Sequence, residues 1–73
     1  MAQQPSPISV KDCIRFIRER LDGAVAVAKA AEVCAEAGDV GRALAIMLDV
    51  EQPLYEATTL LNAASLLRRW EES

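Results

Sequence analysis

The chain changes direction where its sequence reads Ala37-Gly38-Asp39-Val40-Gly41. Glycine tolerates the left-handed backbone conformation that often follows the last turn of a helix, so Gly38 is suited to end one helix. Aspartate accepts hydrogen bonds from the free backbone amides at a helix start, so Asp39 is suited to cap the next one. We therefore predict a turn over residues 38–41, between a helix over residues 10–37 and a second helical stretch over residues 42–70.

Before this turn, the sequence predicts one long helix. Ser9 is a preferred capping residue, and Asp12 suits the positively charged helix start. Only Gly23 opposes a helix in this segment, at a cost of about 1 kcal/mol relative to alanine. A break at Asp22-Gly23 is the alternative, but the polar residues form one continuous stripe, which favours a single helix. The stripe consists of Lys11, Arg15, Arg18, Asp22, Lys29, Glu32 and Glu36.

After the turn, a second helical pattern is interrupted by Pro53. Its apolar positions follow helical spacing and predict the core face. These positions are Ala43, Met47, Val50, Leu54, Ala57, Leu61 and Ala64, widened by Leu60 and Leu67. Proline lacks an amide hydrogen and clashes with the preceding turn. Either the helix kinks or breaks over residues 49–53, or a third helix starts there with Pro53 in its first turn.

The length of 73 residues allows one small domain. Residues 1–7 contain two prolines and predict a flexible N-terminal tail, whereas residues 8–71 predict a single helical domain. Hydrophobic residues make up 52% of the chain, but thirteen of them are alanine and only three are aromatic. Because alanine buries little area, a single chain offers only a thin core.

The apolar surface of the first helix exceeds what one neighbouring helix covers. Between residues 23 and 37 the polar side chains are only Lys29, Glu32 and Glu36. Small side chains let another helix approach closely. We therefore predict that the hairpin dimerises into a four-helix bundle; the alternative is a monomeric three-helix bundle, with a bend at Pro53. The predicted dimer or partner interface consists of Ala24, Val27, Ala28, Ala31, Cys34 and Ala35.

The charges differ between the two ends of such a hairpin. Residues 1–22 and 57–73, which share the open end, carry six basic and five acidic side chains, a net charge of +1. Residues 23–56, which form the turn half, carry two basic and six acidic side chains, a net charge of −4. An antiparallel dimer would set each acidic half beside the basic end of its mate, which argues for orientation rather than for stability.

Composition disfavours several classes of function. The chain has no histidine, the commonest general base and metal ligand, and we expect no catalytic, metal or cofactor site. The net charge of −3 disfavours nucleic-acid binding, and no segment is apolar enough to span a membrane. Cys13 and Cys34 are 21 residues apart, without metal or redox spacing, so we expect reduced thiols in a cytoplasmic protein. Close carboxylate pairs belong to the solvated faces: Glu32 with Glu36, and Asp49 with Glu51.

Two clusters combine an aromatic residue with arginines: Arg15-Phe16-Ile17-Arg18, and Arg68-Arg69-Trp70. If Ile14, Ile17 and Leu21 face the core, Phe16 points away from it, and an aromatic ring between arginines is able to stack on an RNA base. The alternative is that Phe16 packs on a neighbouring helix while the arginines pair with nearby carboxylates. A tryptophan beside arginines is typical of an interaction hot spot, and the alternative is that Trp70 closes the core.

These residues carry three resemblances. The run Arg15-Phe16-Ile17-Arg18 resembles the first helix of the Rop family of small plasmid RNA-binding regulators, which are two-helix hairpins that dimerise into four-helix bundles. This resemblance implies that Phe16 faces RNA. The stretch 37–43, with Pro53 ten residues later, looks like the inter-helix turn of a tetratricopeptide repeat. In length and architecture the chain is similar to short helical-hairpin regulators of proteobacteria and their phages, including quorum-sensing anti-activators, which bind and block another protein.

We therefore predict a non-enzymatic protein–protein interaction module. It would be a homodimeric regulator, inhibitor or adaptor that binds another protein, whose identity the sequence does not give. The candidate partner-binding residues are Arg15, Phe16, Arg18, Arg68, Arg69 and Trp70. The alternative is a Rop-like RNA-binding regulator that uses the face formed by Arg15, Phe16 and Arg18.

Overall fold

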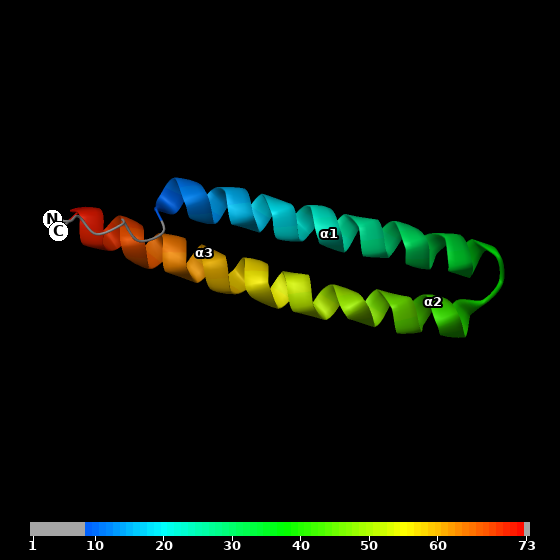
Figure 1. Ribbon diagram of the computed structural model, residues 1–73. Coiled ribbons are helices and arrows are strands. Elements are labelled where there is room, and N and C mark those ends of the chain that lie inside the picture. Colours follow the sequence, from blue (N-terminus) through cyan, green and yellow to red (C-terminus); the bar gives the residue numbers. More distant parts are fainter. Residues whose placement is uncertain (1–8, 73) are drawn as a thin grey trace, which may run out of the picture.

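The computed structural model describes residues 9–72, and within them every long element is a helix. Helix α1 spans Val10–Glu36 and helix α2 spans Val40–Met47. A short 3-10 helix, η1, spans Leu48–Val50 and is followed by helix α3, Glu51–Glu72. Figure 1 shows that α2 and α3 run back along α1, which confirms the predicted helical hairpin. The predicted tail, residues 1–7, and residue 8 lie outside the described residues.

Both predicted helix caps are present, Ser9 before α1 and Asp39 before α2. The Ser9 hydroxyl accepts a hydrogen bond from the Asp12 amide at 3.1 Å, and the Asp12 carboxylate accepts one from the Ser9 amide at 3.3 Å. This capping box satisfies two of the amides that a helix start leaves free, and the hydrogen bond from the Ser9 amide to the carboxylate is the main cause that lowers the pKa of Asp12. Beyond it, α1 continues through Gly23 without a break.

The turn between the arms spans residues 37–39 and is one residue shorter than the predicted turn over residues 38–41. Gly38 adopts a φ of 95°, and the Asp39 carboxylate accepts a hydrogen bond from the Arg42 amide at 3.0 Å. Because Asp39 caps the helix directly, α2 starts at Val40 rather than at residue 42. The Gly38 amide also donates to the Ala35 carbonyl at 3.0 Å, which closes the end of α1.

The left-handed conformation of Gly38 gives a direct test of the turn. We expect Gly38→Ala to lower the free energy of unfolding by about 1–2 kcal/mol, because a Cβ atom is strained at positive φ. The control is Gly23→Ala inside α1, where a Cβ atom would meet nothing within 4 Å. That change should raise the free energy of unfolding by about 0.5–1 kcal/mol, as alanine favours helix. Urea unfolding followed by circular dichroism measures both; equal stability of Gly38→Ala and the natural chain would contradict this turn.

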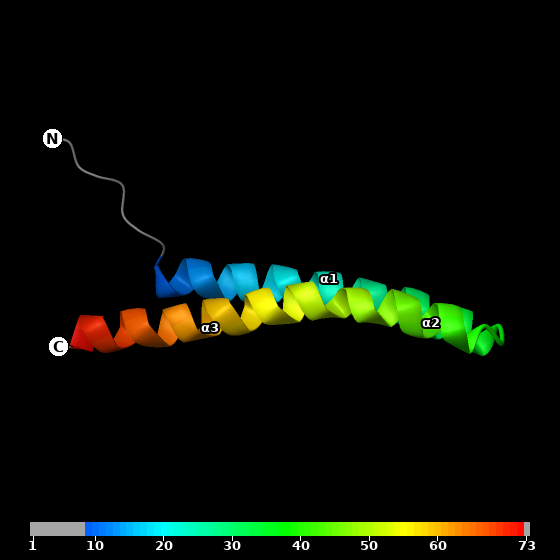
Figure 2. The ribbon, with the colours of Figure 1, turned by 90° about the horizontal axis from the view of Figure 1, so that it is seen from below.

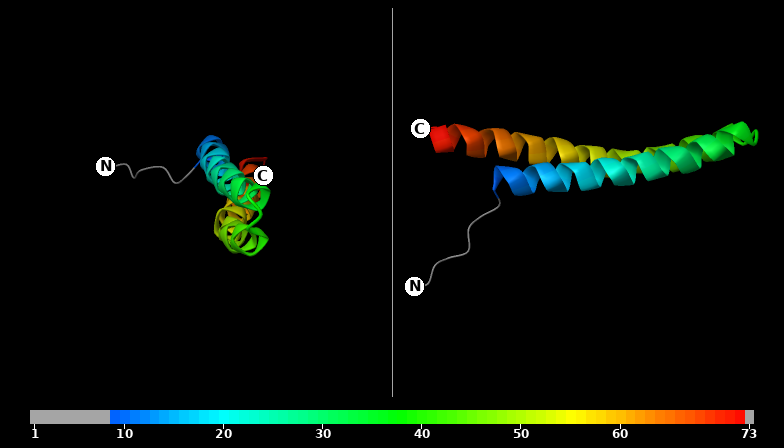
Figure 3. Two further views of the ribbon diagram at one scale, coloured as in Figure 1. Left: turned by 90° about the vertical axis from the view of Figure 1, so that its right-hand side faces the viewer. Right: turned by 90° about the horizontal axis from the view of Figure 1, so that it is seen from above.

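Pro53 is accommodated without a bend in the hairpin. The 3-10 turn of η1 separates the two helices, so Pro53 occupies the third position of α3, in a first turn where its missing amide costs little. Figures 2 and 3 show α2 and α3 in line, as one arm beside α1. We call α2, η1 and α3 together the second arm. Because it stays in line, the chain does not form the alternative three-helix bundle, and it measures 59 × 24 × 14 Å.

The two arms meet along a narrow seam. Its buried members recur every seven residues, which is about two helical turns, so they form one row along each arm. The rows are Ala24 and Ala31 on α1, and Ala43, Val50, Ala57 and Ala64 on the second arm, with Cys13 buried near the start of α1. Half-buried side chains complete the seam: Ile17, Arg20, Val27 and Cys34 on α1, and Ile46, Pro53, Leu60 and Leu67 on the second arm. The most deeply buried positions of the seam are therefore mainly alanine.

The predicted core face was wrong for half of its large residues. Ile14 and Leu21 on α1, which one interpretation of Phe16 placed in the core, are 60% and 43% exposed. Three residues of the predicted core face of the second arm are also exposed: Met47, Leu54 and Leu61. The alanine rows let the arms approach closely and take the centre of the seam, so the next row around each helix is left outside. By the same rotation Phe16 does not point away from the seam but is half-buried.

Candidate interaction surface

One side of the hairpin carries an unbroken set of exposed or half-buried apolar positions, which we call the apolar face. It comprises Ile14, Leu21, Ala28 and Ala35 on α1, and Val40, Met47, Leu54 and Leu61 on the second arm. On each arm these residues recur every seven positions, and all but Val40 come directly after a seam residue, so they follow the seam along its length. Its six larger side chains are between 39% and 68% exposed.

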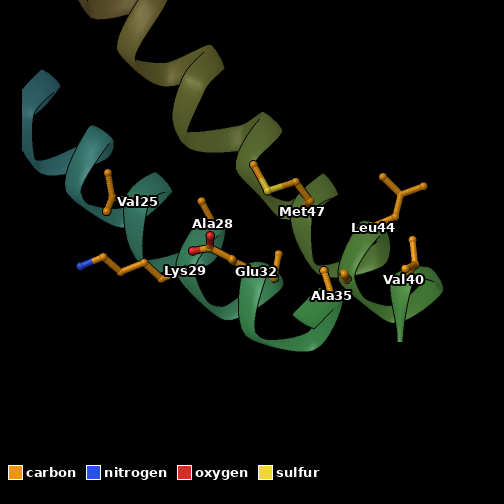
Figure 4. Close-up of a pocket in the computed structure, with 10 residues that line it drawn as sticks. Val25, Ala28, Lys29, Glu32, Ala35, Val40, Leu44 and Met47 are labelled. Carbon is orange, nitrogen blue, oxygen red and sulfur yellow. The ribbon is translucent and has the colours of Figure 1, made fainter. Parts of the chain in front are cut away.

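Near the turn, the apolar face is hollowed into a groove. Its floor is formed by small side chains, which include those of Ala28, Ala31 and Ala35. The groove has a volume of about 610 Å³. Figure 4 shows Val25 and Ala28 on α1 and Met47, Leu44 and Val40 on α2 lining it. Lys29 and Glu32 form its polar rim on α1. On α1 the face is therefore graded, with the small Ala28 and Ala35 at the groove and the large Ile14 and Leu21 toward the open end of the hairpin.

The opposite side of the seam is polar. Arg20 donates a hydrogen bond from Nε to Oε1 of Glu56 at 2.8 Å, and Gln52 donates one to Oε2 at 2.9 Å. The hydrogen bond from Gln52 and, after it, the one from Arg20 lower the pKa of Glu56. Glu56 directly precedes the buried Ala57, whereas Leu54 and Leu61 of the apolar face directly follow the seam residues Pro53 and Leu60, so they lie on opposite sides. This network thus places charged and polar side chains beside the seam on the side opposite the apolar face.

The six predicted interface residues fall into two groups. Ala24 and Ala31 are 8% and 5% exposed and are buried in the seam of one chain. Val27 and Cys34 are half-buried at the same seam. The other two, Ala28 and Ala35, line the groove. The large residues of the apolar face were missed as interface residues because their spacing also fits a core row.

The first arginine cluster is engaged in contacts within α1. The Arg15 guanidinium lies 3.3 Å from the Asp12 carboxylate and 5.0 Å from the centre of the Phe16 ring. Arg18 pairs with Asp22 at 2.9 Å. The structure therefore matches the alternative in which these arginines pair with neighbouring carboxylates.

The second cluster lies at the free end of α3, which extends past the start of α1 (Figure 1). Trp70 is 64% exposed there, so it does not close the core as the alternative expected. Arg68 pairs with Glu72 at 3.0 Å and lies 3.8 Å from Glu71, and Arg69 is exposed beside them. The exposed ring of Trp70 is thus the largest aromatic surface that this end presents.

Among residues 9–72, no group of three histidine, cysteine, aspartate or glutamate side chains is placed to hold a metal ion. No helix in the same range is long and apolar enough to cross a membrane. Cys13 and Cys34 are free thiols. Comparison with known proteins found no matching family model, no matching curated protein and no matching solved structure.

Proposed function

We propose that the chain is a non-enzymatic protein–protein interaction module. It self-associates through the apolar face into a four-helix bundle and acts, in the cytoplasm, as a small regulator, inhibitor or adaptor of another protein. The observation that carries this proposal is the apolar face itself, which has no polar side chain at any of its eight positions. Large exposed apolar patches on small proteins are typical of interaction sites.

The distribution of large and small side chains supports the proposal. The seam within one chain buries mainly alanines, while leucine, isoleucine and methionine remain on the apolar face. Burying a leucine side chain stabilises by about 1.5–3 kcal/mol relative to leaving it exposed, which is far more than alanine gives. Helices that place apolar residues at three positions in seven, rather than two, are suited to bundles in which each helix has two apolar neighbours.

A second protein would then bind outside the bundle. The free end of α3 remains available because it extends past α1 and does not belong to the apolar face (Figure 2). Trp70 with Arg68 and Arg69 offers an aromatic and cationic surface of the kind that dominates binding energy at interfaces. RNA binding by the face of Arg15, Phe16 and Arg18 is less well supported, since both arginines are paired and the ring is half-buried.

Sedimentation equilibrium of the full chain tests the proposal. We expect a mass of twice 7.9 kDa at micromolar concentrations, with dissociation on dilution. A mass of 7.9 kDa at 100 µM would overturn self-association. A salt-sensitive mobility shift with structured RNA that Phe16→Ala abolishes would overturn the proposal that the partner is a protein. It would favour the RNA-binding alternative.

A further inference from the structure

We propose that two copies of the chain pair with their hairpins antiparallel, so that Ile14 and Leu61 of each copy fill the groove at the turn of the other. This inference rests on the proposed self-association through the apolar face and adds its orientation. The occupant of the groove is therefore a second copy of this chain. Identical patches pair most simply about a two-fold axis, and there are two ways to place that axis when the apolar faces meet.

In the antiparallel arrangement the axis runs across the helices. Each α1 then lies on α1 of the second copy in the opposite direction, and the second arms do the same. Along α1, Ile14 meets Ala35 of the second copy and Leu21 meets Ala28, because each pair is equally far from the middle of the face. Along the second arm, Leu61 meets Val40 by the same spacing. Large side chains at the open end of one hairpin thus meet the groove of the other.

In the parallel arrangement the axis runs along the helices, and each α1 lies on the second arm of the other copy. Ile14 of each copy would meet Leu61 of the other at the open end, whereas the two grooves would face each other at the turn, with Ala35 of one copy beside Val40 of the other. The groove of about 610 Å³ would then remain incompletely filled. Protein interiors are close-packed, so both the crowding and the void disfavour this arrangement.

The charges favour the same orientation. The turn half, residues 23–56, carries a net charge of −4, and the open end carries +1. Arg18 and Glu32 both flank the apolar face on α1, seven positions on either side of Val25, so the antiparallel pairing sets Arg18 of each copy beside Glu32 of the other. Among the charged residues that flank the apolar face, only Glu51 would meet the same residue of the second copy. Glu51 is exposed, and repulsion between exposed like charges is weak.

Cysteine cross-linking tests the orientation directly. In the background of Cys34→Ala, with Cys13 only 1% exposed, the variant Arg18→Cys with Glu32→Cys should form a covalent dimer on mild oxidation. The two positions are separated by about 21 Å along one helix, so a bond within one chain is excluded. The matched controls are the two single variants, which should stay monomeric on a non-reducing gel because each residue is then about 20 Å from its own counterpart.

A double-mutant cycle that exchanges a large and a small side chain tests whether Ile14 of one copy fills the groove of the other. We expect Ile14→Ala and Ala35→Ile each to weaken dimerisation at least tenfold, the first by emptying the groove and the second by blocking it. The double variant should dimerise within about threefold of the natural chain, since it exchanges the two residues that meet. Circular dichroism checks that each variant remains helical; both sites are exposed in the single chain.

The outcomes separate this inference from the proposed function. A chain that sediments as a monomer overturns both. Two results together would overturn only the antiparallel arrangement. The chain would form a dimer that the paired cysteines do not cross-link, and the double variant of Ile14→Ala and Ala35→Ile would dimerise as weakly as the sum of the two single effects predicts. A dimer that cross-links through the paired cysteines and recovers in the double variant supports both.

Discussion

Leu54→Glu is expected to convert the dimer into a monomer and to weaken self-association at least 100-fold, or by about 3 kcal/mol. Leu54 lies in the middle of the apolar face and is 45% exposed in the single chain. In the dimer it would be covered, so two carboxylates would have to be buried without partners. Sedimentation velocity over a dilution series measures the change in dissociation constant.

The matched control is Leu66→Glu. Leu66 is 41% exposed on the same helix but lies two positions after the buried Ala64, away from the apolar face. The same change of side chain at nearly the same exposure should therefore leave the dissociation constant within about threefold. Equal weakening by both substitutions would contradict an interface on the apolar face and point to a general loss of helix stability.

A second readout follows from mass action. If the hairpin is marginal alone and gains stability by pairing, its melting temperature rises with protein concentration. We expect this dependence for the natural chain and for Leu66→Glu, and its absence for Leu54→Glu. A melting temperature that is independent of concentration in all three would show that folding and association are not coupled.

Local features of the fold could be predicted from the sequence because their causes are local. Gly38 is the residue that tolerates a positive φ, and Asp39 and Ser9 accept hydrogen bonds from amides three residues later. The choices at these positions depend on a few neighbouring atoms. The continuity of α1 through Gly23 is local in the same sense, since one glycine costs less than the surrounding alanines supply.

The facing of the helices could not be predicted, because it depends on how closely the arms approach. Ala57 and Leu61 both lie on the apolar side of α3, and leucine is the more hydrophobic of the two. Sequence spacing therefore assigned both to one core. The structure buries Ala57 and leaves Leu61 57% exposed, because a seam lined by alanine brings the arms close together. A row of residues that the sequence predicted in the core therefore lies outside the seam and forms the candidate interaction surface.

The close approach of the arms makes a strong prediction for Ala24→Leu. Ala24 is 8% exposed in the seam, and a leucine there would force the arms apart. Overpacking of this kind costs about 1–3 kcal/mol, a large part of the roughly 4–11 kcal/mol expected for the unfolding of a chain of this size. Urea unfolding at fixed protein concentration measures the loss. The control is Ala26→Leu, which lies on the outer side of α1 and should change the free energy of unfolding by less than about 0.5 kcal/mol.

The same substitution decides whether Ala24 serves the seam or a dimer interface, as its sequence context first indicated. In the background of Leu54→Glu the chain is monomeric, so a residue that acts only between chains has no remaining effect there. We expect the cost of Ala24→Leu to persist in that background at about its original size, because Ala24 is buried within one chain. If the cost vanished in the monomer, Ala24 would belong to the contact between copies, and the alanine-lined seam would not be what holds the two arms together.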